Sequence, residues 1–303
     1  MNEKKVLITG CGGMLGDAVY SEFKKVYQNI LATDIDLNEA WLSHLDVRDI
    51  HECERVFLEF KPDIVLHLAA LTDLEYCENN QENCWLTNAL GAENVALLCE
   101  KHGCTMIYIS TAGIFDGEKE EFTDFDAPNP LSYYAKSKYY GELFVGNHVS
   151  KYYIFRAGWM MGGGIKKDKK FIKKIYDQIK KGQKLLHVVD DKLGTPTYTF
   201  DFARSMLKVI DTGYYGLYNQ VCGGSCSRYD VAKEFVRLLD LENEITIKIV
   251  PSDYFKETFY APRPYSEKLV NLKLNARKIN YMRDWKVCLA EYSKVYFDDY
   301  NKS

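Results

Sequence analysis

The sequence predicts an α/β fold in which a doubly wound parallel sheet is combined with a smaller C-terminal lobe. Two observations support this prediction. Short apolar runs alternate with helical patterns in the first half of the chain, and the pattern changes after residue 160. Apolar runs separated by helices indicate parallel strands, because such strands are buried on both faces. Right-handed crossovers then make a doubly wound sheet the simplest topology.

The positions of these patterns give the order of the elements. The expected strands are residues 5–9, 29–33, 63–68, 105–109 and 152–155. The expected helices between them are residues 14–26, 50–59, 82–102 and 131–147. Later residues show a basic helical stretch over 166–181, helices over 199–211 and 228–240, and a strand over 245–249. We therefore expect residues 1–160 to form the sheet domain, with 188–216 returning to it, and 161–303 to form the lobe.

Composition and charge narrow the class of protein. The chain has 303 residues, of which 47% are hydrophobic and 27% are charged, as in ordinary globular proteins. A net charge of -4 gives no electrostatic reason to bind nucleic acid or an anionic membrane. No apolar run approaches the ~18 residues of a membrane span, and no signal-peptide pattern is present. We expect a cytoplasmic protein without nucleic-acid or membrane partners.

The nine cysteines indicate neither a disulfide framework nor a metal site. Their number is odd, no Cys-x-x-Cys pair occurs, and none of the six histidines pairs with a cysteine at zinc-ligand spacing. We expect reduced, mostly buried thiols and no metal ligands.

A glycine-rich turn follows the first strand and opens the first helix. Residues 9–16 read Thr-Gly-Cys-Gly-Gly-Met-Leu-Gly. Gly10 permits the tight turn, Gly13 lets a pyrophosphate approach the backbone, and Gly16 lets the helix pack closely on the sheet. The helix N-terminus favours the negative charge of the pyrophosphate. The turn predicts a Rossmann-type dinucleotide site, with contacts at Gly10, Gly13, Met14, Leu15 and Gly16.

An acidic residue follows this turn at the spacing of a ribose ligand. Asp34 ends the second apolar run, 24 residues after Gly10. Its carboxylate would accept hydrogen bonds from the adenosine ribose and repel a 2′-phosphate, and no arginine follows until Arg48. The cofactor is therefore expected to be NAD(P)H, with NADH favoured.

A second constellation predicts carbonyl chemistry. Tyr134 and Lys138 lie at positions i and i+4 of an expected helix and so share one face. Ser110 and Thr111 end the fourth expected strand, at the edge where ligands bind. Carbonyl reduction needs a hydroxyl that polarises the carbonyl, a second that donates a proton, and a cation that lowers the pKa of the donor. The other Tyr-Lys pairs at this spacing have no nearby strand that ends in a serine or threonine.

The motifs resemble those of the extended short-chain dehydrogenases/reductases and, within them, the dTDP-4-dehydrorhamnose reductase family. The resemblance covers nearly the whole chain. Its markers are the glycine turn, Asp46-Val47, Ala69-Ala70 with Thr72, Asn88, residues 110–117 (Ser-Thr-Ala-Gly-Ile-Phe-Asp-Gly), Tyr134 with Lys138, and residues 156–159, 194–197 and 261–264. It implies cofactor contacts at Asp46, Val47, Leu68, Ala69, Ala70, Thr72, Tyr134 and Lys138.

The resemblance also implies roles in a reaction. Thr111 would polarise the carbonyl and contact substrate, Tyr134 would donate the proton, and Lys138 would lower the pKa of Tyr134 and contact ribose. Trp159 would lie beside the sugar and Arg263 would hold the nucleotide diphosphate, although Trp159 also fits a core position and Arg263 a brace within the lobe. The implied activity is NAD(P)H-dependent reduction of a nucleotide-activated 4-keto-6-deoxyhexose. Homodimers are common for this fold.

One departure from the family pattern leaves alternatives open. Ala112 and Gly113 stand where the reductases usually carry an acidic residue and an aromatic one. The identity of the sugar is therefore open, and a 4,6-dehydratase, which needs an acid and a base there, is disfavoured. The alternatives are an epimerase on the same fold and a non-catalytic, cofactor-binding regulatory subunit resembling the β-subunit of methionine adenosyltransferase.

Overall fold

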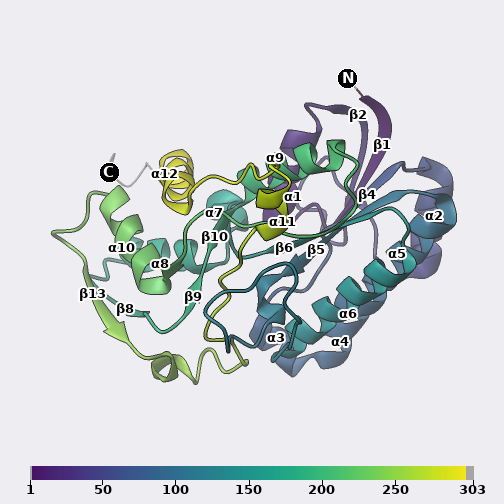
Figure 1. Ribbon diagram of the computed structural model, residues 1–303. Coiled ribbons are helices and arrows are strands. Elements are labelled where there is room, and N and C mark those ends of the chain that lie inside the picture. Colours follow the sequence, from purple (N-terminus) through teal and green to yellow (C-terminus); the bar gives the residue numbers. More distant parts are fainter. Residues whose placement is uncertain (1, 298–303) are drawn as a thin grey trace.

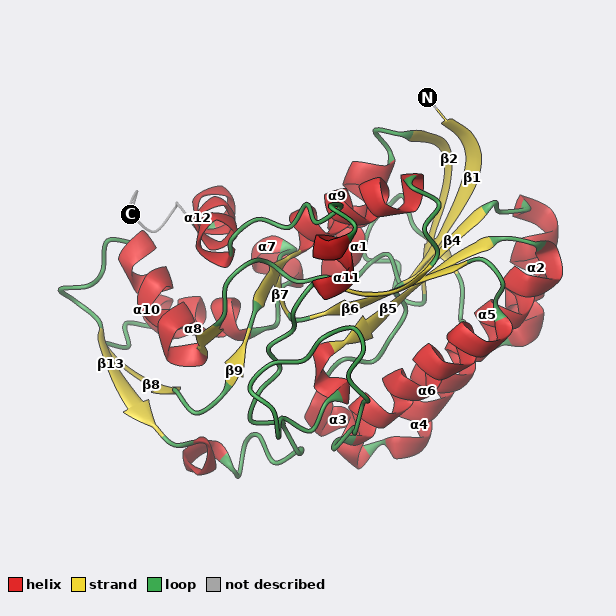
Figure 2. Ribbon diagram, in the orientation of Figure 1, coloured by secondary structure: helices red, strands yellow, loops and turns green. Residues whose placement is uncertain are grey.

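A seven-stranded parallel sheet forms the centre of the protein. The computed structural model describes residues 2–297 and places the strands in the order β11-β6-β5-β4-β1-β2-β3 (Figures 1 and 2). These strands are β1 (Asn2–Thr9), β2 (Tyr27–Asp34), β3 (Ser43–His44), β4 (Ile64–His67), β5 (Thr105–Thr111), β6 (Tyr152–Ala157) and β11 (Gly216–Asn219). Every pairing between them is parallel. The predicted doubly wound α/β fold is confirmed.

Helices cover both faces of this sheet because its strands alternate their side chains between two cores. Val6 and Ile8 of β1 pack with α1 (Met14–Phe23) and α9 (Thr199–Asp211). Leu7 points to the opposite core, which includes α2 (Ile50–Phe60), α5 (Gly91–His102) and α6 (Tyr133–His148). Because both faces are buried, the strands read as continuous apolar runs in the sequence.

The chain leaves the sheet after β6 and later returns to it. Residues 199–219, comprising α9 and β11, form the returning segment: α9 packs on the core that contains α1, and β11 pairs with β6. Earlier residues of the predicted range 188–216 lie in the lobe, where β8 (Leu185–Val189) pairs with β13 (Thr246–Val250). The sheet is thus completed by residues that follow part of the lobe in sequence.

The lobe has small sheets and its own core, and it occupies the left of Figure 1. Its other strands are β7 (Trp159–Met161) with β10 (Pro196–Tyr198), and β9 (Leu193–Gly194) with β12 (Cys226–Ser227). Its helices are α7 (Gly164–Lys167), α8 (Phe171–Lys180), α10 (Arg228–Leu238) and α12 (Trp285–Tyr296). The short helix α11 (Leu272–Ala276) packs instead on β11, with Leu274 in the core of the main sheet (Figure 1). Residues 298–303 of the predicted lobe, and residue 1 of the sheet domain, lie outside the described residues.

Two expected helices differ from the prediction. Residues 166–181 do not form one helix, because the buried carboxylate of Asp168 accepts hydrogen bonds from the Lys170 amide (2.7 Å) and the Tyr292 hydroxyl (2.8 Å) and interrupts the chain between α7 and α8. Residues 82–102 are helical, but α4 (Gln81–Trp85) and α5 are joined by a π-helical turn, Leu86–Leu90. Such turns occur frequently at functional sites. A further short helix, α3, spans Leu74–Asn79.

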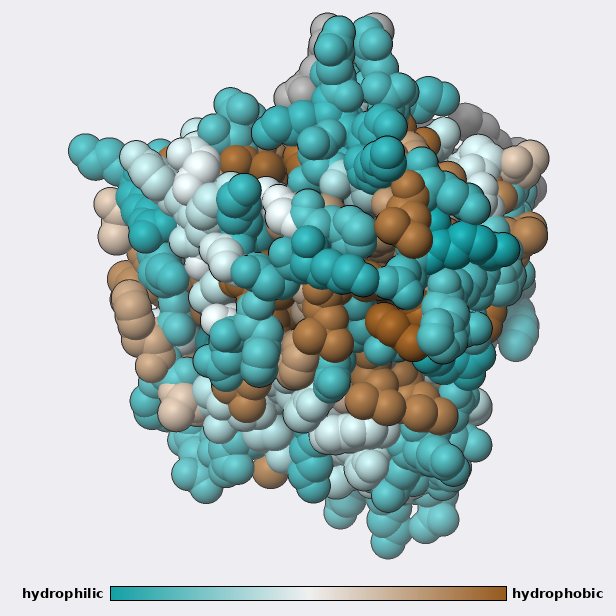
Figure 3. Space-filling model, turned by 90° about the vertical axis from the view of Figure 1, so that its right-hand side faces the viewer, coloured by the Kyte–Doolittle hydropathy of each residue, from teal (hydrophilic) through white to brown (hydrophobic). Residues whose placement is uncertain are grey.

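All nine cysteines are buried and unpaired, as expected. Within residues 2–297 no helix is long and apolar enough to cross a membrane, and no group of three or more acidic, histidine or cysteine side chains could hold a metal ion. The side of the molecule shown in Figure 3 carries apolar patches broken up by polar groups. Exposed leucines occur on α2, α5 and α6, at Leu58, Leu97 and Leu143.

Candidate functional site

The glycine turn lies at the carboxyl edge of the sheet, between β1 and the neighbouring β4. Gly10 has a positive φ of 67°, and a Cβ there would lie 2.4 Å from the backbone of Ala69. A Cβ on Gly16 would lie 2.1 Å from the carbonyl oxygen of Cys11. At Gly13, the N-cap of α1, a Cβ would meet no atom closer than 3.6 Å. The first amides of α1 (Met14, Leu15 and Gly16) have no partner within their own helix and are therefore suited to bind an anion.

Asp34, at the end of β2, contacts the glycine turn through its side chain. Its carboxylate accepts hydrogen bonds from the amide of Gly12 (2.9 Å) and from its near neighbour Asp36 (3.0 Å). These bonds hold the Asp34 carboxylate next to the glycine turn, where the sequence predicts a side chain that binds the adenosine ribose. The carboxylate also holds the turn in shape.

The next predicted contacts lie beyond β3. Arg48 donates hydrogen bonds to both carboxylate oxygens of Asp46, and these lower the pKa of Asp46. Val47 is buried, and its carbonyl accepts a hydrogen bond from Asn94 (3.0 Å). Backbone and side-chain bonds therefore hold this segment at the rim of the sheet.

The loop that follows β4 is held by the π-helical turn. Asn88 is fully buried, and its side chain bonds both the amide (2.7 Å) and the carbonyl (2.9 Å) of Leu71. The Leu68 amide donates a hydrogen bond to the carbonyl oxygen of Thr9 (3.0 Å). The next residue of the loop, Ala69, packs against Gly10. Lys170 reaches from the lobe to the carbonyl (3.0 Å) and hydroxyl (3.3 Å) oxygens of Thr72. The loop through Ala70 is thus fixed beside the glycine turn.

Thr111 and Tyr134 meet at the end of β5. Ser132 caps α6 by accepting a hydrogen bond from Ala135, which fixes the start of the helix that carries Tyr134. Burial raises the pKa of the Tyr134 phenol, and a hydrogen bond with the Thr111 side chain opposes this increase. The amide of Gly113 also bonds Thr111 Oγ1, at 3.1 Å.

Lys138 lies one turn further along α6, but its ammonium faces a different aromatic ring. Its Nζ stands 4.1 Å from the ring centre of Tyr108, whose hydroxyl donates to the Lys138 carbonyl (2.9 Å). Burial lowers the pKa of Lys138 to about 7, although Glu142 opposes this shift. Burial thus dominates the pKa values of both Tyr134 and Lys138 in this structure. A phenol with a raised pKa keeps its proton at neutral pH, which is the state that a proton donor requires.

Two buried polar atoms near this edge have no hydrogen-bond partner among the described residues: Ser110 Oγ, next to Thr111, and Nε2 of His67, at the end of β4. Burial lowers the pKa of His67 to about 3, so its ring is neutral. Unsatisfied buried polar atoms are rare in folded proteins. Both atoms are closed off from solvent, behind the edge of the sheet that carries the glycine turn and Thr111.

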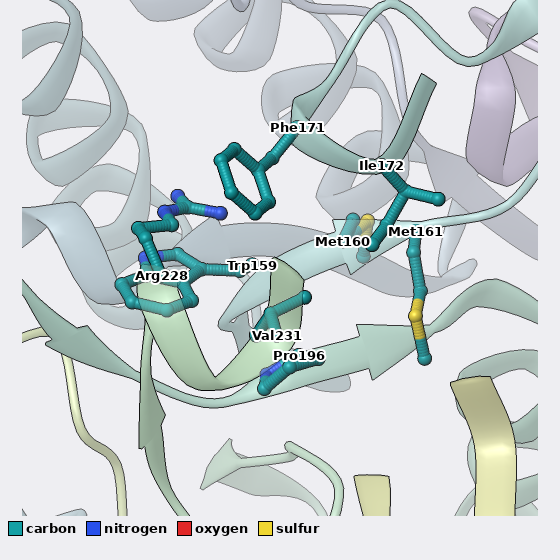
Figure 4. Close-up of a pocket in the computed structure, with 8 residues that line it drawn as sticks. All are labelled: Trp159, Met160, Met161, Phe171, Ile172, Pro196, Arg228 and Val231. Atoms are coloured by element: carbon teal, nitrogen blue, oxygen red, sulfur yellow. The ribbon is translucent and has the colours of Figure 1, made fainter. Parts of the chain in front are cut away.

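A second group of polar and aromatic side chains lies in the lobe, where Figure 4 shows Trp159, Phe171 and Arg228 close together. The Arg228 guanidinium lies 3.6 Å from the ring centre of Trp159 and 5.1 Å from that of Phe171. Burial lowers the pKa of Arg228 to about 10, so it stays charged at neutral pH. The indole of Trp159 donates its N–H to Glu267 Oε2 at 2.6 Å.

Arg263 is engaged within the protein. Its guanidinium pairs with Glu75 (2.7 Å) and donates to the Ala261 carbonyl (2.9 Å). It lies near enough to Arg228 to lower the pKa of that residue. The structure therefore places Arg263 beside the group around Trp159, joined to α3.

Glu267 and Arg228 were not predicted from the sequence. Glu267 Oε1 lies 3.4 Å from the position that a Cβ on Gly113 would take, so a carboxylate does lie beside Thr111 even though Ala112 and Gly113 supply none. The nearest signal was the Ala-Pro-Arg-Pro segment three residues upstream, which points to this part of the chain but not to this side chain. Arg228 carried no signal, because it stands alone at the start of a helix.

The sheet order, glycine turn and Thr111–Tyr134–Lys138 group define the chain as a short-chain dehydrogenase/reductase of the extended type. It belongs to the family described as the RmlD substrate binding domain, which matches residues 4–297. The predicted membership is confirmed.

Solved structures and curated proteins are similar over almost the whole chain. A dTDP-4-dehydrorhamnose reductase from Clostridium acetobutylicum is 36% identical, with a TM-score of 0.88 over 96% of this chain and 99% of that one. The enzyme of that name from Bacillus anthracis, in complex with NADP, is 30% identical, with a TM-score of 0.88 over 97% and 100%. Spore coat polysaccharide biosynthesis protein SpsK from Bacillus subtilis is 29% identical over 95% of this chain and 96% of its own. Methionine adenosyltransferase 2 subunit beta from Xenopus laevis is 25% identical over 95% and 86%.

Proposed function

We propose that this protein is an NAD(P)H-dependent reductase that acts on a nucleotide-activated 4-keto-6-deoxyhexose. The observation that carries the proposal is that Thr111, at the end of β5, lies close enough to Tyr134 of α6 to lower its pKa, with Lys138 on the same helix. Relatives named dTDP-4-dehydrorhamnose reductase, one of them in complex with NADP, support the substrate class and the cofactor class.

The glycine turn and its neighbours fit a nicotinamide dinucleotide. The turn leaves no room for side chains at Gly10 and Gly16, and the first amides of α1 face the edge of the sheet. Asp34 would bind the adenosine ribose, residues 46–47 the adenine, and residues 68–72 the central part of the dinucleotide. When bound, this cofactor supplies the hydride for the carbonyl carbon.

The side chains at the end of β5 would handle the carbonyl oxygen. The Thr111 hydroxyl donates a hydrogen bond to that oxygen, and Tyr134 transfers its phenolic proton to it. The resulting phenolate favours the ammonium form of Lys138, because an opposite charge raises the pKa of a lysine. Lys138, whose pKa in this structure is about 7, is therefore able to bind a proton when Tyr134 gives one up.

Arg228 and Arg263 would hold the rest of the substrate. Trp159 is buried in the lobe core, with Arg228 over its ring and Gly194 packed against it, so it supports the site by holding Glu267 and Arg228 in place. The two arginines place positive charge nearby, which suits a nucleotide diphosphate. Arg263 would have to share its guanidinium between Glu75 and the diphosphate.

Asp34 favours NADH over NADPH in this proposal. Its carboxylate is fixed by the Gly12 amide and cannot turn away from a 2′-phosphate without losing that bond. We expect kcat/KM to be higher with NADH than with NADPH, and the ratio to fall in Asp34→Asn. Equal efficiency with both cofactors in the unmodified protein would contradict this preference.

The decisive experiment follows NADH absorbance after addition of dTDP-4-keto-6-deoxyglucose, with and without a 3,5-epimerase. Consumption that requires the epimerase indicates a rhamnose-type reductase, and consumption without it indicates reduction of another 6-deoxysugar. No consumption of NADH or NADPH in either case would contradict the proposal. An epimerase would instead interconvert nucleotide sugars without net cofactor consumption.

A regulatory subunit is the second candidate, because the methionine adenosyltransferase 2 subunit beta is similar over 95% of this chain. Such a subunit would bind the dinucleotide and a protein partner in a fixed ratio without turning over a sugar. Pull-down of a stoichiometric partner, together with absent sugar turnover, would favour it.

A further inference from the structure

Glu267 holds its carboxylate at the meeting point of the sheet and the lobe. One oxygen, Oε2, accepts the indole N–H of Trp159 at 2.6 Å. The other, Oε1, faces Gly113, the second residue after Thr111. The carboxylate therefore touches both the lobe residue expected beside the sugar and the turn that follows the catalytic threonine.

The backbone of Glu267 is fixed from two sides. Its amide donates to the Leu193 carbonyl (2.8 Å), and Leu193 in turn donates to the Tyr265 carbonyl (3.0 Å). On the other side, the Phe122 amide donates to the Lys268 carbonyl at 2.8 Å. Bonds on both flanks leave little freedom to the main chain, so the position of the carboxylate is determined by the fold.

The second carboxylate oxygen is available for a ligand. Within residues 2–297, Oε1 has no hydrogen bond or ion pair, whereas Oε2 is bound to the indole. Gly113 carries no side chain, and a Cβ there would stand 3.4 Å from Oε1 and 3.5 Å from Thr111 Oγ1. Glu267 also acts electrostatically on both Tyr134 and Arg228. Its charge therefore lies close to the groups that would handle the carbonyl.

We propose that Glu267 is a specificity-determining residue whose Oε1 accepts a hydrogen bond from the sugar hydroxyl adjacent to the reacting carbonyl. This inference rests on the proposed function. In a 4-keto-6-deoxyhexose, the carbonyl is flanked by C3, which carries a hydroxyl, and by C5, which carries the methyl group. The hydroxyl that Glu267 accepts is therefore the one on C3.

The geometry allows one sugar to engage both residues. Thr111 Oγ1 and Glu267 Oε1 lie within 3.5 Å of the same point, so a carbonyl and its neighbouring hydroxyl can reach both through hydrogen bonds of about 3 Å. Two such bonds fix the rotation of the sugar about its carbonyl, which orients the carbonyl oxygen toward Tyr134. Glu267 thus positions the substrate, while Tyr134 supplies the proton.

The test compares two substrates in the wild type, Glu267→Ala, Glu267→Gln and the exposed control Glu257→Gln. One substrate is the nucleotide-activated 4-keto-6-deoxyhexose, and the other lacks only the C3 hydroxyl. Hydrogen bonds to charged groups predict that Glu267→Ala loses about ten- to a hundredfold in kcat/KM with the 3-hydroxy substrate. With the 3-deoxy substrate, which has no hydroxyl to bind, the same variant should lose less than about threefold.

Two readouts separate positioning from a structural role. The isosteric Glu267→Gln keeps an oxygen for the Trp159 indole, so it should fold normally and show an intermediate loss on the 3-hydroxy substrate alone. Dissociation constants for NADH and melting temperatures should match those of Glu257→Gln. Equal losses on both substrates, or no loss on either, would overturn the inference. Turnover of the substrate by the wild type in the same assays would still support the proposed function. If the wild type turns over neither substrate, the proposed function fails and this inference fails with it.

Discussion

At the scale of single residues, burial decides the chemistry of Tyr134. Burial raises the pKa of its phenol, and the neighbouring Thr111 side chain opposes this increase. Nearby, Lys138 is also buried, and its lowered pKa of about 7 reflects the cost of a charge without solvent. In the proposed reaction, Tyr134 would donate its proton and Lys138 would respond to the phenolate.

Replacing Tyr134 by Phe tests this arrangement. Loss of the proton donor should lower kcat by about 10² to 10⁴, because general acid catalysis contributes about that much. Binding of NADH, measured by fluorescence titration, should change little. Tyr140→Phe is the matched control, because it removes a hydroxyl from the same helix that bonds only Glu93. Near wild-type turnover in Tyr134→Phe would exclude Tyr134 as the donor.

Residue types at fixed spacing revealed part of the candidate site, and tertiary contacts supplied the rest. The glycine turn and the Tyr134–Lys138 pair are local patterns, so the sequence alone predicts them. Glu267 is far from Gly113 in the sequence, and only the folding of the lobe onto the sheet brings the two together. No local pattern distinguishes such a carboxylate from any other exposed acid.

At the scale of elements, α6 packs closely against β5 along the face that carries Lys138. Gly141 makes this possible: a Cβ there would lie 2.5 Å from the hydroxyl and 3.0 Å from the ring of Tyr108. Tyr108 is fully buried, and its hydroxyl anchors the Lys138 carbonyl at 2.9 Å. By letting α6 approach β5 closely, Gly141 determines how far Lys138 lies from the sheet.

Two alanine substitutions in α6 should have opposite effects. Gly141→Ala overpacks the contact with Tyr108 and should lower the free energy of unfolding by about 1–3 kcal/mol. Gly146→Ala meets nothing closer than 3.8 Å, so it should raise that free energy by about 0.5–1 kcal/mol through helix propensity. Urea unfolding measures both. Equal changes in the free energy of unfolding for the two variants would show that the close contact with Tyr108 does not make Gly141 necessary.

The sequence predicted helices and strands correctly where their hydrophobic patterns extend over several residues. The five expected strands match β1, β2, β4, β5 and β6, because each is an apolar run between helices. In the lobe, the expected strand over 245–249 matches β13, whereas the other lobe strands span two to five residues and were not predicted. The break before α8 was missed because it depends on Asp168 bonding Tyr292, a residue of α12.

At the scale of the whole molecule, a buried carboxylate joins the sheet layer to the lobe. Asp201 of α9 is 3% exposed and binds the Arg283 guanidinium at 2.5 and 2.8 Å. Burial raises the pKa of Asp201, but the bonds from Arg283 and Cys288 outweigh burial and hold the pKa below its usual value. Asp201 therefore stabilises the fold above the unfolded pKa of about 4, and this contribution is lost as the pH falls further.

Arg283→Met should destabilise the protein most at neutral pH. It leaves the Asp201 charge buried with a weaker partner, which typically costs about 3–5 kcal/mol. Towards pH 4 the gap to the wild type should narrow, because the stranded carboxyl group then takes up a proton. Thermal unfolding across this pH range measures the gap, with the exposed Arg237→Met as the control. A gap independent of pH would show that Asp201 is not the group responsible.

The return of the chain through α9 and β11 also determines when the sheet can be finished during synthesis. A ribosome releases residues in order, so a nascent chain of about 160 residues would end its sheet at β6, with nothing to pair the outer edge. That edge, Tyr152–Ala157, is almost wholly buried in the finished protein and would be a template for pairing with other chains. The edge stays open until β11 ends at Asn219. A fragment cut at residue 160 should therefore aggregate, because it exposes the edge of β6 that β11 covers in the finished protein.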